Sequence, residues 1–182
     1  MLQIKYIGVD PGKSGAITEL YEDGSIAQIY DMPLTPDKSK VSNTELTKIF
    51  RRYNSHVVFV LEESHAMRFT DKDGQERSQS VSSMLTYGKH WGVLLGLILM
   101  TGARYHTITP QQWQTKFKVK GKQRGYNSVS IAQKIFPNHL YLPFAEKNNR
   151  AKNGIKLFDG RSDSALLARW GFECHKAATK SI

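Results

Sequence analysis

The sequence has little cysteine, no long apolar run and a shortage of acidic residues. Its only cysteine, Cys174, excludes a disulfide within the chain and most zinc sites built from cysteine. The longest apolar stretch, Trp91 to Met100, is about half the ~20 residues that a membrane helix needs. The first residues also lack the long apolar segment of a signal peptide. We therefore expect a cytoplasmic protein (in the host cytoplasm if viral) without membrane association.

The charge balance is strongly basic. Lys and Arg number 26 against 16 Asp and Glu, which gives a formal net charge of +10 and a sequence pI near 9.7. Such a balance favours polyanionic partners, nucleic acid first and an anionic membrane surface second. The length of 182 residues predicts one domain, spanning 1–182, with a sizeable core.

An acidic residue follows a predicted core strand near the start of the chain. The run Ile4 to Val9 is mostly apolar and β-prone, and it ends at Asp10-Pro11-Gly12. Because Pro11 disfavours helical geometry in the residue before it, the Asp10 carboxylate should lie at the strand end. Burying its charge is costly unless something pairs with it. The alternative is a local turn in which Asp10 bonds only its own backbone.

A second predicted core strand also ends in acid. Segments 15–21 and 25–30 flank a glycine turn and predict a hairpin, so three antiparallel strands come first. A capping pattern at Ser42 then predicts a helix. The strand expected at 56–61 is followed by Glu62 and Glu63, and strand alternation turns one of these away from Asp10.

A long helix is predicted over 79–101, after a polar segment, 64–78, that reads as a mobile loop. Gly88, Gly92 and Gly96 recur every fourth residue and so share one edge of this helix. Each costs about 1 kcal/mol relative to alanine, so something should approach that edge closely. Candidates are the sheet, a partner subunit or nucleic acid, and packing within the chain is the simplest.

The second half of the chain carries a run of cations. A strand at 104–109, a helix at 111–117 and a helix at 128–136 are expected, whereas 138–158 gives no clear pattern. Between the two helices a cation stands at every second position. If this run is extended, its side chains point to one side, as a phosphate backbone would require, although a solvated loop is the alternative. These cations are Lys116, Lys118, Lys120, Lys122 and Arg124.

The last predicted helix begins with two acids. Steps of four, three and four residues place Asp159, Asp163, Leu166 and Trp170 on one helical face. A favourable charge at the helix N-terminus accounts for Asp159, but it accounts poorly for Asp163, which lies a full turn inside.

Two strand-end acids and two acids on a helix predict one shared site. If their oxygens lie about 4 Å apart, each like-charge pair costs roughly 4 kcal/mol at an effective dielectric near 20. Such a cluster needs cations, and carboxylate oxygens select Mg²⁺, or Mn²⁺ in its place, over zinc. Two such ions can activate water and stabilise the leaving oxygen of a phosphodiester. With a basic chain, the expected substrate is DNA or RNA.

The order of elements resembles the ribonuclease H-like α/β fold, with a five-stranded mixed sheet, three antiparallel strands then two parallel, flanked by helices. The motifs resemble RuvC-type Holliday junction resolvases, especially their short phage-like branch. Three acid motifs carry this likeness, and Thr109-Pro110-Gln111-Gln112-Trp113 and Phe136-Pro137 add to it. The acid motifs are Ile7-Gly8-Val9-Asp10-Pro11-Gly12, Val60-Leu61-Glu62 and Asp163-Ser164-Ala165-Leu166-Leu167-Ala168.

The resemblance implies a crossover junction endonuclease, acting in DNA recombination, repair or phage genome processing. Asp10, Glu62 and Asp163 would be catalytic metal ligands, with Asp159 as the fourth acid and two Mg²⁺ ions per site. The familiar final pair of acids is three residues apart, whereas position 160 here is glycine. Family members cut as homodimers, and the 79–101 helix would supply that interface. The cation run, Lys13 and Phe69 would contact branched DNA, Phe69 by stacking on a base, although an ordinary loop aromatic is the alternative.

Other readings remain open. Actin-like ATPases and sugar kinases also open with a strand ending in an Asp-x-Gly turn, but they need two such halves. A non-catalytic nucleic-acid-binding protein would be expected to lack the acids. A less selective debranching nuclease, or one that cuts RNA–DNA hybrids, has the same acids. No small-molecule cofactor is expected.

Overall fold

A five-stranded sheet lies at the centre of the computed structural model, which describes residues 3–63, 68–70, 76–78, 80–119, 124–139, 142–148 and 154–179, with the backbone alone at 68–70, 76–78 and 124–126. The strand order is β3-β2-β1-β4-β7. The first three strands pair antiparallel, and β4 and β7 run parallel to β1, as predicted. The strands are β1 (Ile4–Val9), β2 (Ala16–Tyr21), β3 (Ile26–Asp31), β4 (Val58–Glu62) and β7 (Arg104–Ile108).

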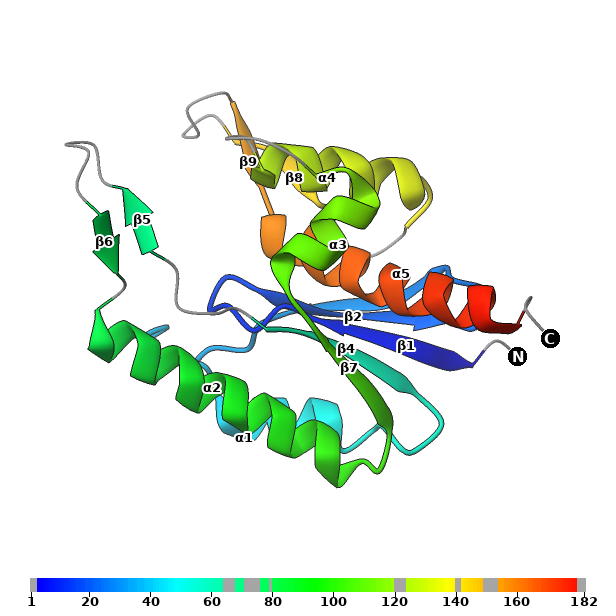
Figure 1. Cartoon of the computed structure of the whole chain (residues 1–182), viewed down its shortest axis with the longest axis horizontal. Coiled ribbons are helices and arrows are strands. Elements are labelled where there is room, and N and C mark those ends of the chain that lie inside the picture. Colours follow the sequence, from blue (N-terminus) through cyan, green and yellow to red (C-terminus); the bar gives the residue numbers. More distant parts are fainter. Residues whose placement is uncertain are drawn as a thin grey trace.

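Helices cover both faces of this sheet (Figure 1). One face carries α1 (Asn43–Phe50) and α2 (Val81–Met100), and the other carries α5 (Asp159–Thr179) with α3 (Pro110–Phe117) and α4 (Arg124–Ile135) beside it. Side-chain caps, of which the one at Ser42 was predicted, explain two of the helix starts. The Ser42 side chain accepts the Glu45 N–H at α1, and Thr109 forms a capping box with Gln112 at α3. In the described ranges no helix is both long and apolar enough to cross a membrane.

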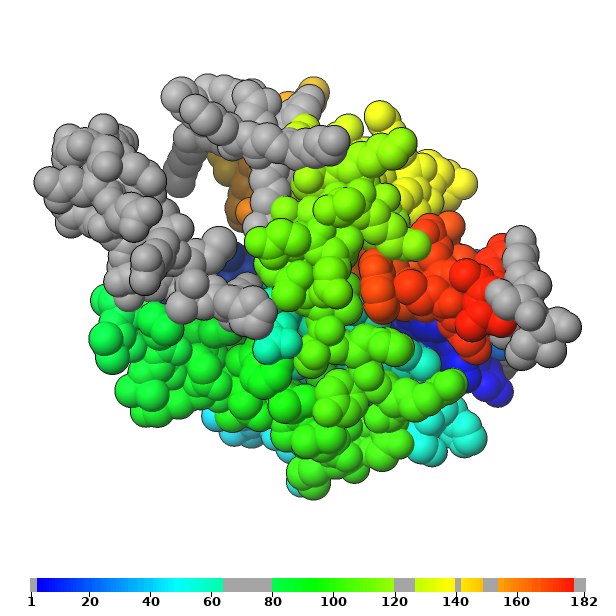
Figure 2. Space-filling view, in the orientation of Figure 1, coloured from blue at the N-terminus to red at the C-terminus, as the bar shows by residue number. Residues whose placement is uncertain are grey.

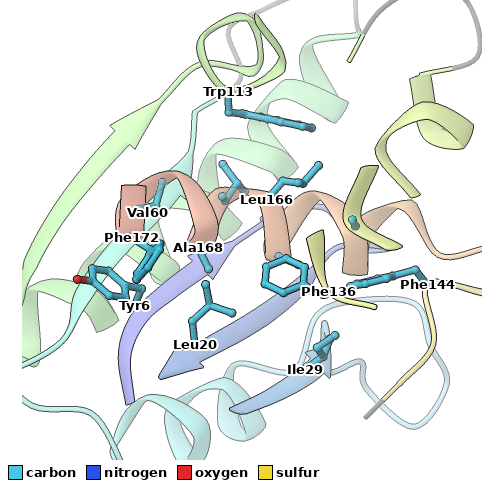
Figure 3. Close-up of a cluster of buried hydrophobic side chains, with 14 of the residues drawn as sticks. Tyr6, Leu20, Ile29, Val60, Trp113, Phe136, Phe144, Leu166, Ala168 and Phe172 are labelled. Atoms are coloured by element: carbon cyan, nitrogen blue, oxygen red, sulfur yellow. The ribbon is translucent and has the colours of Figure 1, made fainter. Parts of the chain in front are cut away.

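Two apolar clusters fill the layers on either side of the sheet, which explains why the central strands are apolar throughout. Ile7 and Val9 of β1 pack toward α1 and α2, together with Phe59 of β4. Tyr6, the alternate residue of β1, belongs to the cluster under α5. Figure 3 shows that second cluster, where Leu166 and Ala168 of α5 lie over the sheet. Because β1 and β4 are buried on both faces, their ends are held rigidly.

Glycine lets α5 lie directly on β1. A Cβ built on Gly8 would stand 2.0 Å from the carbonyl oxygen of Ser164 and 2.4 Å from the backbone nitrogen of Ala168. One on Gly171 would stand 2.8 Å from the Val60 side chain of β4. No side chain fits in either gap, so the backbone of α5 approaches the sheet more closely than an ordinary helix could. This close approach brings the first turns of α5 toward the ends of β1 and β4.

The segments expected to be irregular contain two small strand pairs. Segment 64–78, predicted to be a loop, includes the antiparallel pair β5 (Arg68–Thr70) and β6 (Glu76–Ser78). Segment 138–158 includes the antiparallel pair β8 (Ala145–Lys147) and β9 (Ile155–Leu157). Both pairs lie outside the central sheet (Figure 1). Three-residue strands span too little sequence to produce a readable alternation, which is why the pattern did not predict them.

The glycine edge of α2 is open rather than packed. Among the described residues nothing lies within 4 Å of a Cβ built on Gly88, Gly92 or Gly96. Packing against the described residues therefore does not explain these glycines. Val81, Leu85 and Leu99 lie along the same edge and are 83%, 56% and 54% exposed. The surface of α2 is visible in green at the lower left of Figure 2.

Candidate active site

Asp10 and Glu62 stand at the same end of neighbouring parallel strands. The β1–β4 register pairs Val9 with Leu61, so the next residue of each strand lies beside the other. Asp10 is partly buried, and its Oδ1 accepts the Gly12 N–H at 3.1 Å. The local turn considered from the sequence therefore exists, but it occupies only one side of a carboxylate that has other acids around it.

Asp163 and Asp159 come from the first turns of α5. Asp163 is 8% exposed, whereas Asp159 is exposed and accepts the Gly160 N–H on its Oδ1 at 3.1 Å. Here α5 lies against the turn that follows Asp10, because a Cβ on Gly160 would stand only 2.1 Å from the Ser14 carbonyl oxygen. Position 160, where the spacing implied by the family resemblance would place an acid, therefore has no space for any side chain. This steric limit excludes an acid at position 160, and the extra acid of this chain stands at position 159.

The four acids share one electrostatic environment. The pKa of Asp10 is raised from 3.8 to about 8, first by burial and then by the charges of Glu62, Asp163 and Asp159, while the Gly12 N–H opposes the shift. Glu62, Asp163 and Asp159 thus lie close enough to Asp10 for their charges to act on it. Glu63, the competitor of Glu62, is not among those groups. A carboxyl with so high a pKa holds a proton near neutral pH unless a cation offsets its neighbours.

A buried acid elsewhere in the fold shows the contrast. Glu19 of β2 is 2% exposed, yet it forms an ion pair with Arg52 at 2.7 Å and accepts a hydrogen bond from Tyr53 at 2.6 Å. Burial raises the pKa of Glu19, and both partners lower it. Asp10 instead has three further acids among the groups acting on it. Glu19 is therefore suited to holding the fold together, and Asp10 to binding a cation.

The donor set suits a hard divalent cation. All four side chains offer carboxylate oxygens, the ligands that Mg²⁺ and Mn²⁺ prefer. Over the described ranges, however, no group of three or more His, Cys, Asp or Glu side chains is arranged to hold a metal ion as it stands. The negative charges of neighbouring carboxylates repel one another, so a bound cation would have to draw these four side chains together.

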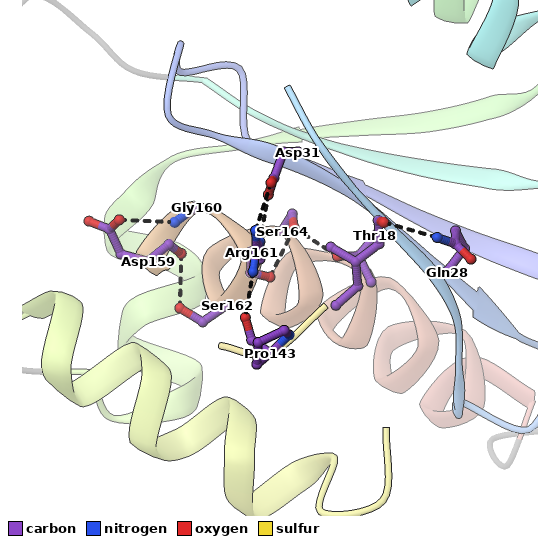
Figure 4. A network of polar contacts seen from close by, with 10 residues as sticks. Thr18, Gln28, Asp31, Pro143, Asp159, Gly160, Arg161, Ser162 and Ser164 are labelled. Atoms are coloured by element: carbon purple, nitrogen blue, oxygen red, sulfur yellow. Dashed lines mark hydrogen bonds and ion pairs between the residues drawn. The ribbon is translucent and has the colours of Figure 1, made fainter. Parts of the chain in front are cut away.

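A polar network fixes the first turns of α5 (Figure 4). Arg161, 8% exposed, makes a bidentate ion pair with Asp31 at the end of β3 and donates to the Pro143 carbonyl at 2.8 Å. Ser164 meets Thr18 of β2 at 2.7 Å. Because these bonds lie on both sides of Asp163 in the sequence, they fix the rotation of α5 and the direction of that carboxylate.

Three residues near the site were not predicted from the sequence. The Trp113 indole donates to Glu62 Oε1 at 2.8 Å, and the Trp91 indole donates to the Glu62 carbonyl at 3.0 Å. His90 lies near the Pro11 carbonyl, and burial lowers the pKa of His90 while that carbonyl opposes the shift. Trp113 belongs to a segment that carried the family resemblance, which was the one signal in the sequence that could have pointed to it.

The described members of the predicted cation run do not lie on one extended segment. Lys116 lies in the last turn of α3 and pairs with Glu173 of α5 at 3.2 Å, so this cation of the run is compensated by an acid. Lys118 caps α3 with a left-handed backbone (φ 57°), and Arg124 begins α4. Lys13 is exposed in the turn after Asp10. Lys120 and Lys122, and the side chains of Phe69 and Arg124, lie outside the described residues.

Comparison with solved structures places the fold. No protein-family model matches the chain, and no curated protein sequence does. The structure titled "T. thermophilus RuvC in complex with Holliday junction substrate" aligns with a TM-score of 0.54 and 9% identity, over 93% of this chain and 94% of that one. A second Thermus thermophilus RuvC structure aligns with a TM-score of 0.52 and 11% identity, over 94% and 95%. The chain therefore has the mixed α/β, ribonuclease H-like fold of RuvC.

Proposed function

We propose that this protein is a divalent-metal-dependent endonuclease that cuts branched DNA, four-way (Holliday) junctions above all. One observation carries the proposal. Asp10 follows β1, and its pKa is raised to about 8 by burial together with the carboxylates of Glu62 from β4 and of Asp163 and Asp159 from α5. Natural folds seldom gather acids without compensating cations unless the acids bind a cation themselves.

Asp10, Glu62 and Asp163 would hold Mg²⁺, with Mn²⁺ as a substitute and Asp159 as a fourth acid. When bound, two such ions supply an activated water and charge stabilisation for the leaving oxygen of a phosphodiester. The chain itself supplies the rigid ends of β1 and β4 and the clamped start of α5, so that the acids are held before substrate arrives. Asp159, exposed at the helix start, would act nearest the solvent side of the site.

DNA is the substrate that the charge favours. The formal net charge of +10 provides a general attraction for phosphates, and Lys13 stands exposed three residues after Asp10. Lys118, Lys120, Lys122 and Arg124 would contact the phosphate backbone, and Phe69 would stack on a base at the crossover. Lys116 contributes less, since it is already paired with Glu173. Branched DNA is favoured over linear DNA because the fold is that of RuvC, and a RuvC structure contains a Holliday junction substrate.

The proposed assembly is a homodimer formed through α2. The open edge of Gly88, Gly92 and Gly96 would let two helices approach closely, and the exposed side chains of Val81, Leu85 and Leu99 would become buried. Two sites in one dimer would cut two opposed strands of a four-way junction. Sedimentation should give a dimer for the wild type and a monomer for Leu85→Glu. The matched control Lys134→Glu, exposed on α4, should stay dimeric. A monomeric wild type would rule this interface out.

A substrate panel tests the proposed activity. Labelled four-way, Y-shaped and linear duplex DNA and an RNA–DNA hybrid would each be incubated with the protein, with Mg²⁺ or with EDTA. We expect paired nicks in the four-way junction, with Mg²⁺ only. Equal cutting of four-way and Y-shaped DNA would instead indicate a less selective debranching nuclease, and preference for the hybrid an RNA-directed one. Tight binding without any cleavage would leave a non-catalytic nucleic-acid-binding protein.

A further inference from the structure

Two of the chain's three tryptophans donate hydrogen bonds to one residue, the proposed metal ligand Glu62. Trp113 of α3 reaches its carboxylate at 2.8 Å, and Trp91 of α2 reaches its backbone carbonyl at 3.0 Å. These donors come from helices on opposite faces of the sheet (Figure 1). The third tryptophan, Trp170, packs its ring on His106. Because its ring contact is with His106 rather than with Glu62, Trp170 serves as the control tryptophan within the same chain.

The hydrogen bond from Trp113 to Glu62 joins two buried side chains. Trp113 is 0% exposed and sits in the apolar cluster under α5 (Figure 3), and Glu62 is 6% exposed. A buried indole N–H needs an acceptor, and a buried carboxylate needs donors. A hydrogen bond to an ionised acceptor is also about twice as strong as one between neutral groups. Phenylalanine would fill an apolar site without any N–H to satisfy, so the tryptophan is explained by its bond rather than by packing alone.

The two bonds act on different degrees of freedom of Glu62. Glu62 is the last residue of β4 and pairs in register with Ile108 of β7. The hydrogen bond from Trp91 holds the backbone carbonyl of Glu62 on the side of β4 that faces away from β7. The Trp113 bond then fixes the carboxylate relative to the fixed backbone. Among the described residues Asp10 has no comparable side-chain donor, since its hydrogen-bond partner is the backbone N–H of Gly12. The Glu62 carboxylate is thus held directly by a hydrogen bond from another side chain.

We propose that Trp113 is a positioning residue that holds the Glu62 carboxylate in the orientation needed to act with Asp10, and that Trp91 fixes the strand end that carries it. The catalytic part of this inference rests on the proposed function. Hydrogen-bond partners that orient metal ligands typically matter by about 10–100-fold in metal affinity or activity. We expect an effect of this size for Trp113→Phe, which removes the N–H and keeps an aromatic ring in the core.

Nuclear magnetic resonance tests the bond without any cleavage. In protein with ¹⁵N-labelled tryptophan the three indole N–H signals would be assigned from Trp91→Phe, Trp113→Phe and Trp170→Phe. Glu62→Gln exchanges an ionised acceptor for a neutral one, so the Trp113 signal should move upfield while the Trp170 signal stays in place. Titration with Mg²⁺ should move the Trp113 signal of the wild type, and not that of Glu62→Gln. A Trp113 signal unmoved by Glu62→Gln would overturn the proposal.

Cleavage kinetics then separate positioning from packing. Trp113→Phe should cut a four-way junction about 10–100-fold more slowly than the wild type, with junction binding unchanged, and Trp170→Phe should cut at the wild-type rate. On the Glu62→Gln background, Trp113→Phe should cause no further loss, because the two residues act as one unit. A folded Trp113→Phe protein with wild-type cleavage would also overturn the proposal. If the wild type cuts no DNA the proposed function fails, and the indole signals still decide the role of Trp113.

Discussion

Replacing Gly8 by alanine would show whether the close approach of α5 to β1 builds the site. The added methyl group would stand 2.0 Å from the Ser164 carbonyl oxygen and 2.4 Å from the Ala168 nitrogen. Both are backbone atoms of a helix whose residues here are fully buried, so no flexible side chain can move aside. Either α5 moves away from the sheet or β1 bends.

The magnitude follows from the size of this overlap. Overpacking a core typically costs about 1–3 kcal/mol, and a clash with backbone on both sides belongs at the upper end. For a chain of this length each 1 kcal/mol lowers Tm by about 2–4 °C, so Gly8→Ala should lower Tm by about 6–12 °C. Ordinary contact begins near 3.4 Å, so α5 must shift by about 1 Å or more. A misplacement of ~1 Å can cost ~100-fold in rate.

Circular dichroism melting and cleavage of a four-way junction at 20 °C, where the variant is still folded, measure the two effects. For the melting measurement the control is Gly88→Ala, at which nothing lies within 4 Å of the new methyl among the described residues. Measured at concentrations where the chain is monomeric, that variant should gain up to about 1 kcal/mol from helix propensity. Replacing glycine by alanine should therefore lower the stability at position 8 and raise it at position 88. If Gly8→Ala melts and cuts like the wild type, the reasoning from close packing to site geometry is wrong.

Three further predictions concern the charges of the site and its surroundings. In metal-free protein, stability should fall as the pH rises from 3.8 to about 8, because the folded state keeps a proton on Asp10 that the unfolded state has released. Urea unfolding at several pH values measures this slope, and Asp10→Asn should flatten it; an equal slope in both proteins would contradict the assigned pKa. Replacing Lys118, Lys120 and Lys122 together by glutamine should weaken binding to every DNA and reduce the logarithmic salt slope by about 3, and an unchanged slope removes these residues from the interface. Gly160→Asp recreates the spacing of acids that the family resemblance implies, but a Cβ at position 160 meets the Ser14 carbonyl oxygen at 2.1 Å. The substitution should therefore lower Tm, and it should not restore cleavage when it is added to Asp159→Ala. Restored cleavage would show that the turn at Ser14 can move to accept the side chain.

The elements that carry the acids were predictable because their patterns are long and strong. The strands before Asp10 and Glu62 are buried on both faces, so they read as continuous apolar runs, and both end where the acid begins. The helix of Asp163 showed its buried face through steps of three and four residues. The parallel register of β1 and β4 then places the two strand-end acids side by side without any further information.

Contacts between distant residues were not predictable in the same way. Glu62 and Trp113 are 51 positions apart, and no local pattern says which acceptor a buried indole will meet. Lys116 likewise looked like part of a free cation row, until the packing of α3 beside α5 paired it with Glu173. Among the described residues nothing packs against the α2 glycines, and helical periodicity alone does not predict which edge of a helix is left uncovered.

The most direct test of the account compares junction binding and junction cleavage by Asp10→Asn, with Mg²⁺ present and with EDTA. Asp10 receives the charges of all three other acids, so removing its ionisable oxygen should disable the site while the cations that hold DNA remain. We predict wild-type affinity for a four-way junction in gel-shift assays and no Mg²⁺-dependent cutting above the EDTA background. Wild-type cutting by Asp10→Asn would contradict the claim that these carboxylates form a metal-dependent nuclease site.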